Sequence, residues 1–149
     1  MLTFLKTNSS HPHFIELVRL LDADLAERDG ADHSFYAQFN KINMIQHVIM
    51  AYESDVPVAC GAFKFFEEAC VEIKRMYVVP QYRNKGIAAA VLNELELWAK
   101  EEGYTSTVLE TGMKQPEAIR LYEKSGYHRI PYYGQYAGVE NSVCMKKIL

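Results

Sequence analysis

The sequence predicts one mixed α/β (α+β) domain, and two observations lead to that prediction. Three strand-like runs follow one another in the first half of the chain, at residues 47–53, 56–66 and 69–79. From residue 86 onward, helical and strand-like patterns alternate. The chain has 149 residues, which is an ordinary size for one domain, so we expect residues 1–149 to fold as a single unit.

The first half of the chain predicts two helices followed by three antiparallel strands. Residues 13–28 carry apolar side chains at helical spacing, and an Asp-Gly pair ends that helix. A shorter amphipathic helix is expected at 34–40. Ser54-Asp55 separates the first two strand-like runs as a hairpin turn would, and Pro80 ends the third run.

Residues 86–102 form the clearest predicted helix. Its apolar stripe consists of Ile87, Val91, Leu95 and Trp98. Glu96 and Lys100 are placed to form an ion pair one helical turn apart, and Gly103 provides a C-terminal cap.

The last third of the chain predicts one more helix between strands. Residues 105–110 read as a short buried strand. Pro116 occupies the first-turn position that proline favours, and Gly126 ends the helix that it begins. Two final strands are expected at 127–130 and 142–147, on either side of a tyrosine-rich loop.

Composition and charge favour a soluble protein that does not bind nucleic acid. The chain is 49% hydrophobic and 23% charged, with a net charge of -3, whereas a nucleic-acid-binding domain would be basic. No apolar run approaches the roughly 20 residues of a membrane-spanning helix, and we see no signal peptide. Three cysteines without CxxC spacing suit a reducing compartment. We therefore expect a cytoplasmic protein that does not bind membranes.

A basic loop between the third strand and the clearest helix predicts an anion site. The first N–H groups of a helix lack internal partners and lie at the positive end of its dipole. Gly86 permits close approach to them, Ala88 keeps the first turn narrow, and Arg83 and Lys85 add positive charge. A diphosphate would suit such a site. The alternative is an ordinary helix start with solvated basic side chains. Neither the Walker pattern nor GxGxxG is present.

Two motifs resemble those of the GNAT acetyltransferases. Arg83-x-x-Gly86-x-Ala88 is similar to the acyl-CoA pyrophosphate loop of that family, and residues 116–127 resemble its second motif, in the family's order. The resemblance covers about residues 45 to 147. It implies the GNAT acyl-CoA N-acyltransferase fold, in which a mixed, mostly antiparallel central sheet is splayed between its fourth and fifth strands and flanked by helices.

The resemblance implies acetyl-CoA (coenzyme A) as the cofactor. In the family, the pantetheine arm lies between the strands that match 69–79 and 105–110, and backbone amides of the loop hold the pyrophosphate. The implied CoA-binding residues are Met76, Val78, Arg83, Asn84, Lys85, Gly86, Ile87, Ala88 and Gln115. Gln115 stands where many members have asparagine, so its contact with the pantetheine is expected from a longer arm. Met76 and Val78 can also be read as ordinary core residues of a strand.

The resemblance also implies a catalytic acid. Tyr122 matches the tyrosine that many members place near the CoA sulfur, where a phenol protonated at neutral pH can donate a proton to the leaving thiolate. The alternative is a core tyrosine, because Ala118, Ile119 and Tyr122 form a helical stripe.

Two glutamates are candidates for the base that takes a proton from the attacking amine. Glu72 precedes Arg83 at the spacing of the strand glutamate in the histone acetyltransferase branch, and Glu110 ends the strand at 105–110. Alternation along the strand places four side chains on one face, those of Cys70, Glu72, Lys74 and Met76. Glu72 can equally be a surface glutamate or an ion-paired one. A buried, inert Cys70 is the common case, so we expect direct transfer in a ternary complex rather than an acyl-cysteine intermediate.

The acceptor site is expected to be aromatic and acidic, as suits a small cationic amine. The candidate acceptor-binding residues are Tyr36, Glu110, Tyr133 and Tyr136. Tyr36 can also be a core residue. The five histidines show no metal-ligand spacing, so no metal is expected.

Together these observations predict an N-acetyltransferase that acts on a primary amine, with an amino acid or a polyamine as the kind of acceptor we expect. Two alternatives stay open at this point. One is a protein lysine or N-terminal acetyltransferase, and the other is a non-catalytic acyl-CoA-binding sensor domain. Many members of the family dimerise, so the resemblance allows a homodimer.

Overall fold

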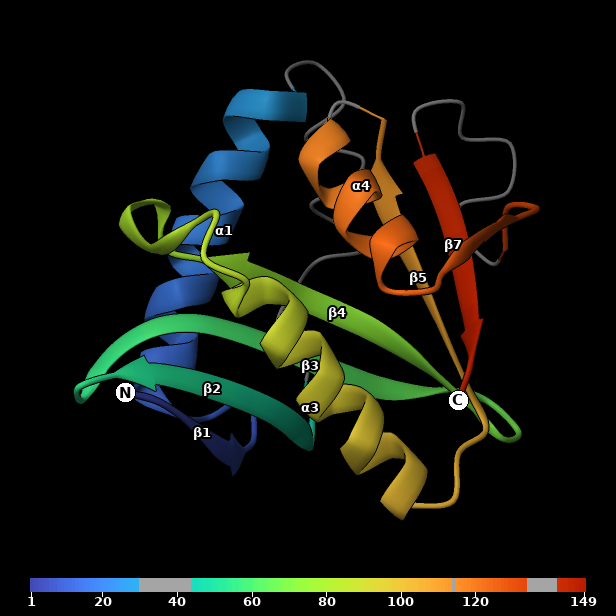
Figure 1. Ribbon diagram of the computed structural model, residues 1–149, viewed down its shortest axis with the longest axis horizontal. Coiled ribbons are helices and arrows are strands. Elements are labelled where there is room, and N and C mark those ends of the chain that lie inside the picture. The colour runs from blue at the N-terminus through green and yellow to red at the C-terminus, as the bar shows by residue number, and fades with distance from the viewer. Residues whose placement is uncertain (30–43, 114, 134–141) are drawn as a thin grey trace.

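The computed structural model describes residues 1–29, 44–113, 115–133 and 142–149, and in these ranges seven strands form one sheet (Figure 1). The strand order is β1-β2-β3-β4-β5-β7-β6. The strands are β1 (Leu2–Thr7), β2 (His47–Glu53), β3 (Val56–Glu67), β4 (Cys70–Val78), β5 (Ser106–Gly112), β6 (His128–Ile130) and β7 (Ser142–Ile148). All neighbouring strands pair antiparallel except β4 and β5, which are parallel. The predicted mixed, mostly antiparallel sheet is confirmed.

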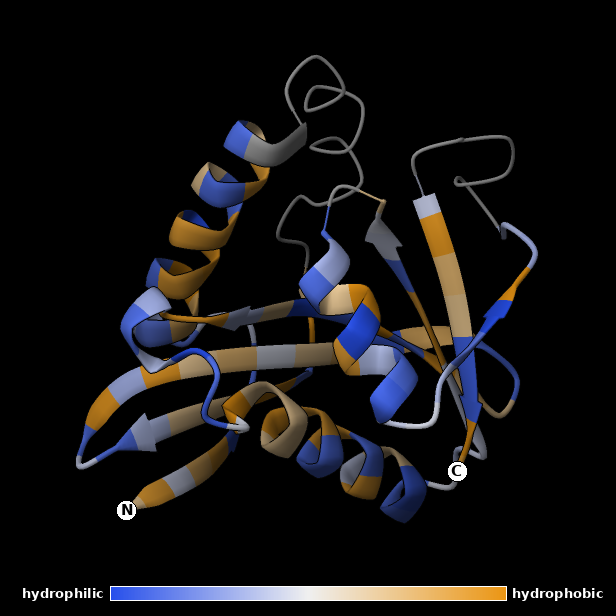
Figure 2. Ribbon diagram, turned by 45° about the horizontal axis from the view of Figure 1, so that its top comes forward, coloured by the Kyte–Doolittle hydropathy of each residue, from blue (hydrophilic) through white to orange (hydrophobic). Residues whose placement is uncertain are grey.

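Helices cover both faces of this sheet. They are α1 (Pro12–Asp29), α3 (Ile87–Glu101) and α4 (Pro116–Lys124), with a short 3-10 turn, η2 (Pro80–Tyr82). Figure 2 shows hydrophobic and hydrophilic residues sharing each helix, as expected for helices with one buried side. In the described ranges, no helix combines the length and the apolarity that a membrane span requires.

Alternate residues of the strands sort into two hydrophobic layers. On β2, Val48 and Met50 pack with α1, whereas Ile49 and Ala51 pack with α3 and α4. The α3 layer is the larger of the two and continues onto β5 and β7 through Leu109 and other apolar side chains. The sheet is therefore buried on both faces at its centre.

The N-terminal strand β1 was not predicted from the sequence. It pairs antiparallel with β2 along its whole length, from Leu2 opposite Glu53 to Thr7 opposite Val48. Only Leu2 and Phe4 pack against the core. Such a short edge strand leaves a weak periodic signal, which explains why the sequence did not reveal it. The helix expected at 34–40 lies outside the described residues.

The sheet opens between β4 and β5. These strands pair through three residue pairs only, from Cys70 opposite Ser106 to Glu72 opposite Val108. Beyond that point they diverge toward their C-terminal ends (Figure 1). The splay predicted between the fourth and fifth strands is thus confirmed. It leaves one edge of β4, over residues 73–78, without a paired strand among the described residues.

β4 contains a β-bulge where the splay begins. Arg75 has a φ of 61°, and the register between β3 and β4 shifts between Cys60 and Ala62. The bulge places one extra residue on β4, and an extra residue in a strand exchanges the faces of all the side chains that follow.

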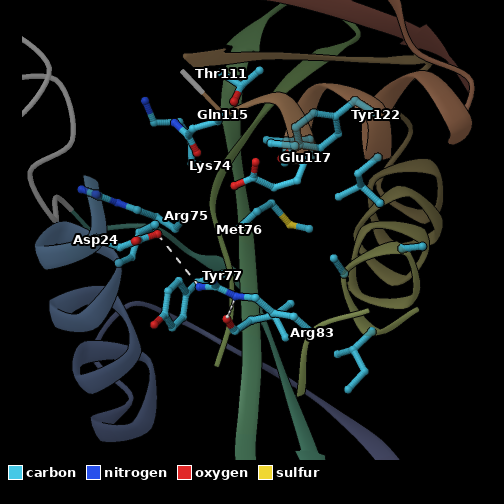
Figure 3. Close-up of a pocket in the computed structure, with 18 of the residues that line it drawn as sticks. Asp24, Lys74, Arg75, Met76, Tyr77, Arg83, Thr111, Gln115, Glu117 and Tyr122 are labelled. Carbon is cyan, nitrogen blue, oxygen red and sulfur yellow. Dashed lines mark hydrogen bonds and ion pairs between the residues drawn. The ribbon is translucent and has the colours of Figure 1, made fainter. Parts of the chain in front are cut away.

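The bulge changes the face on which Met76 lies. Strand alternation predicted Met76 on the same face as Glu72 and Lys74, and that prediction is wrong. Met76 packs in the α3 layer, where a Cβ at Gly61 would lie 2.5 Å from the Met76 sulfur. Tyr77 joins the α1 layer instead. Figure 3 shows Met76 on the side of β4 opposite Lys74.

A buried polar network joins α3 to the second half of the sheet. The Glu96 carboxylate accepts from Lys147 Nζ at 2.8 Å and from the Tyr127 hydroxyl at 2.9 Å, and that hydroxyl lies 2.6 Å from Thr107 Oγ1. Glu96 is buried, whereas Lys100 is exposed. The predicted Glu96–Lys100 pair is therefore wrong, because the carboxylate turns inward to partners far along the chain.

We expect Tyr127→Phe to lower the free energy of unfolding by about 2 kcal/mol, because it removes a donor to a buried carboxylate. Lys100→Ala should change it by less than about 0.5 kcal/mol, as is usual for an exposed side chain. Urea unfolding followed by circular dichroism measures both. Equal costs for the two substitutions would contradict the network.

Candidate functional site

A cavity of about 560 Å³ lies where β4 and β5 diverge (Figure 3). Its walls come from β4, the loop that leads into α3, the first turn of α3, the end of β5, one side of α4 and one side of α1. The fold therefore brings together segments that are far apart in the sequence. Of the predicted CoA-binding residues, those that line the cavity are Met76, Val78, Arg83, Asn84, Gly86, Ile87, Ala88 and Gln115.

The start of α3 offers unpaired N–H groups to this cavity. Gly86 is the N-cap residue, with φ at 79°, and Asn84 before it also has a positive φ of 63°. Ala90 N–H makes an early helical bond to the Gly86 carbonyl, at 3.1 Å. No described side chain caps this end, and no acidic residue lies in the first turn. The geometry is that of an anion site.

The Arg83 side chain lies on the α1 side of the loop. Its Nε donates to the Val78 carbonyl at 2.9 Å, and its guanidinium lies 5.4 Å from the centre of the Tyr77 ring and 4.0 Å from Asp24. Arg83 thus fastens the loop to the end of β4, as Figure 3 shows. Lys85 is not among the described residues that line the cavity; it is exposed, with its ammonium 5.5 Å from the Tyr82 ring.

The unpaired edge of β4 provides backbone groups along the cavity. Glu72 is the last residue of β4 that pairs with β5, and the cavity lining continues from there to Val78. A free strand edge is a template for an extended ligand that carries amide groups. Gln115, the N-cap residue of α4, lines the opposite side of the opening. An extended ligand could therefore be held between β4 and the start of α4.

Tyr122 lines the cavity from α4. It is buried, and its ring lies edge-on to Tyr127 with the centroids 5.8 Å apart. Burial, and secondly the nearby Glu110 carboxylate, raise the pKa of Tyr122 above its ordinary value. The phenol is therefore protonated at neutral pH and is available as a donor.

A polar cluster lies on the α1 face of the sheet, at the point where the strands separate. The Glu72 carboxylate, which is 3% exposed, accepts from the Tyr133 hydroxyl at 2.8 Å. Lys74 Nζ lies 3.9 Å from the other Glu72 oxygen. The Tyr133 ring packs edge-on against Phe66, with centroids 4.8 Å apart. Tyr133 is thus a half-buried support for Glu72 as well as a candidate acceptor-binding residue.

Glu110 completes this cluster from β5. It lines the cavity, is half-buried, and lies opposite Cys144 of β7. If the register of the last β4–β5 pair is continued, Lys74 and Glu110 occupy the next facing positions on the diverging strands. The two candidate bases, Glu72 and Glu110, therefore lie at the same end of the cavity.

The three cysteines are buried, and none of them is among the described residues that line the cavity. Burial raises the pKa of Cys60 to about 12 and also raises the pKa of Cys144. A buried thiol of raised pKa is a poor nucleophile.

The sequence alone did not identify the contribution of α1 to the site. Asp24 reaches the cavity, together with Leu21 and Leu25, and sequence inspection gave Asp24 no role. The Asp24 carboxylate lies 4.0 Å from the Arg83 guanidinium, and a contact between such distant segments leaves no local sequence signal. Tyr36 and Tyr136, two of the predicted acceptor-binding residues, lie outside the described residues.

The sequence matches a family model, that of the acetyltransferase (GNAT) family, over residues 14–127. The chain is 34% identical over 102 residues to an IAA acetyltransferase from Azospirillum brasilense, covering 68% of this chain and 67% of that protein. It is 35% identical over 101 residues to YsnE, an uncharacterized N-acetyltransferase from Bacillus subtilis, covering 66% of this chain and 67% of that protein.

Solved structures show the same fold. A candidate acyl-CoA N-acyltransferase from Klebsiella pneumoniae superposes with a TM-score of 0.84 at 27% identity, covering 100% of this chain and 98% of that one. A paia N-acetyltransferase from Thermoplasma acidophilum, solved with coenzyme A, superposes with a TM-score of 0.74 at 17% identity, covering 100% of this chain and 99% of that one. An acetyltransferase of Elizabethkingia anophelis with acetyl-CoA bound superposes with a TM-score of 0.69 at 17% identity, covering 99% of this chain and 98% of that one.

Proposed function

We propose that this chain, which belongs to the acetyltransferase (GNAT) family, transfers the acetyl group of acetyl-CoA to a primary amine of a small molecule. The observation that carries the proposal is the cavity between β4 and β5. It joins an open helix start, an unpaired strand edge and a protonated tyrosine in one continuous space. These are the three features that a diphosphate, a pantetheine arm and a leaving thiolate require.

The residues present fit acetyl-CoA as a substrate. The backbone amides from Asn84 to Ala88 would hold the diphosphate at the start of α3, with Lys85 close by for additional charge. The edge of β4 near Met76 and Val78 would bond to the amides of the pantetheine arm, and Gln115 would contact the arm from α4. Arg83 would act by holding the loop in this conformation.

The acetyl transfer follows as one displacement in a ternary complex. The neutral amine attacks the thioester carbonyl, so that a C–N bond forms and the C–S bond breaks. The Tyr122 hydroxyl gives its proton to the departing thiolate, and the proton lost by the amine passes to a carboxylate of the cavity. No covalent enzyme intermediate is required, in keeping with the inert environment of the cysteines.

We assign the base to Glu72 and the binding of the acceptor ammonium to Glu110. Glu72 is deeply buried and fixed by Tyr133, which gives a defined position for proton transfer, directly or through a water molecule. Glu110 is half-buried at the opening of the splay, where it can meet an incoming cation.

This assignment predicts different kinetics for two matched variants. Glu72→Gln should lower kcat by about 100-fold, and most at a pH below the pKa of the acceptor amine, where the base is most needed. Glu110→Gln should mainly raise the acceptor KM. Steady-state rates between pH 6 and 10 measure both effects. If only Glu110→Gln shows a pH-dependent loss of kcat, Glu110 is the base and Glu72 binds the ammonium.

Release of free thiol from acetyl-CoA, measured over a panel of amines, tests the proposed function. The panel contains free amino acids, polyamines, and peptides that present an N-terminal amine or a lysine. We expect release with at least one small amine. Release with peptides only would make the chain a protein acetyltransferase. Binding of acetyl-CoA without release from any amine would make it an acyl-CoA sensor.

A further inference from the structure

Lys74 places a buried ammonium in the cavity wall with few partners. Its side chain is 7% exposed and lines the cavity from the α1 face of β4 (Figure 3). Among the described residues, the one carboxylate oxygen within 4.0 Å of Nζ belongs to Glu72, at 3.9 Å. That distance is too long for a hydrogen bond. The three N–H donors of the ammonium are therefore available to whatever enters the cavity.

A buried ammonium without hydrogen-bond partners is unfavourable. Burial lowers the pKa of Lys74, and the positive charges of Lys64 and Arg75 act in the same direction, while the carboxylates of Glu72 and Glu110 oppose them. The other oxygen of Glu72 accepts a hydrogen bond from the Tyr133 hydroxyl at 2.8 Å. An anionic group of a ligand would supply the missing acceptor.

We infer that the acceptor amine carries a carboxylate group and that Lys74 binds this carboxylate. The inference rests on the proposed function, and it narrows the acceptor from amines in general to small amino acids. In such a molecule the amine and the carboxylate are only a few bonds apart. The cavity wall offers an opposite charge for each of these groups, Glu110 for the ammonium and Lys74 for the carboxylate, on two neighbouring strands that diverge beyond their last pair.

Polyamines, protein lysines and protein N-termini lack this feature near the reacting nitrogen. The competing explanation is that Lys74 only balances the charges of Glu72 and Glu110. The two explanations differ in one measurable way. A counter-ion matters equally for every acceptor, whereas a carboxylate-binding residue matters only for acceptors that carry a carboxylate.

The test uses matched acceptors and the full-length protein. Thiol release from acetyl-CoA is measured with free L-amino acids and γ-aminobutyrate, with the amino acid amides, with the amines formed by decarboxylation, and with polyamines. We expect the KM of the best amino acid to be about 10- to 100-fold lower than that of its amide or its decarboxylated amine, as a charge-assisted bond would give. Equal values would overturn the inference.

Three variants test the assignment to Lys74. Lys74→Met keeps the length of the side chain without its charge, and it should remove the preference for the amino acid, so that the KM values of the amino acid and of its decarboxylated amine become equal within about twofold. Lys74→Arg should restore part of the preference. Lys100→Met is the same change at an exposed position of α3 and should behave as the wild type. An equal loss with both acceptors in Lys74→Met would support the counter-ion role and overturn the assignment.

The outcomes separate this inference from the proposed function. Turnover of polyamines or peptides, with none of the amino acids, overturns the inference and leaves acetyl transfer intact. No turnover with any acceptor overturns both. A circular dichroism spectrum and an acetyl-CoA affinity like those of the wild type establish that Lys74→Met is folded.

Discussion

Tyr122→Phe is expected to lower kcat for acetyl transfer by about 100-fold while leaving the Kd for acetyl-CoA within about twofold. The phenol is the protonated donor that lines the cavity, and general acid catalysis typically contributes a factor of this size. Removing one oxygen leaves the ring in place against Tyr127, so the fold should tolerate the change. Steady-state kinetics and calorimetric titration measure the two quantities.

Tyr104→Phe is the matched control for this variant. Tyr104 packs against Phe63 in the α3 layer and is not among the described residues that line the cavity. It should keep the kcat of the wild type. If Tyr122→Phe also keeps it, Tyr122 is a core tyrosine, and the leaving thiolate receives its proton from elsewhere.

Ala88→Asp is expected to weaken acetyl-CoA binding by at least about 100-fold without destabilising the fold. Ala88 lines the cavity in the first turn of α3, where the diphosphate would lie. A carboxylate there repels the diphosphate and occupies the N–H groups that would bind it. The same carboxylate is favourable to the helix itself, by about 0.3 to 1 kcal/mol, because it lies at the positive end of the dipole.

Ala88→Asp is informative because its expected effects on acetyl-CoA affinity and on fold stability have opposite signs. Urea unfolding should show equal or greater stability than the wild type, while calorimetry shows the loss of affinity. Asn93→Asp adds the same charge on an exposed position of α3, beyond the first turn, and should leave the affinity unchanged. Wild-type affinity in Ala88→Asp would remove the start of α3 from the binding site.

Local signals allowed most of the elements to be predicted from the sequence. The helix at 87–101 was placed to within one residue at each end, because its apolar stripe and the glycines around it are local features. Pro116 in the first turn located α4 in the same way. The splayed strands were expected only through the resemblance of two motifs to a family, since no local signal marks a gap in a sheet.

The errors arose where distant residues decide the structure. The bulge at Arg75 has no sequence signal, because arginine seldom adopts a positive φ, and it moved Met76 to the other face of β4. Glu96 pairs with Lys147 and not with Lys100, because its carboxylate points inward and is buried beside Tyr127. The partners of Lys74 likewise depend on how β4 and β5 separate, so its place in the site became visible only in the fold.

Calorimetric titration of the wild-type protein with acetyl-CoA, and with S-acetyl-pantetheine in parallel, tests the central claim most directly. The two ligands share the thioester and the pantetheine arm, but only acetyl-CoA carries the diphosphate. We predict one site with a Kd for acetyl-CoA between about 1 µM and about 1 mM, and binding at least about 100-fold weaker for S-acetyl-pantetheine. No binding of acetyl-CoA, or equal affinity for both ligands, would contradict the account.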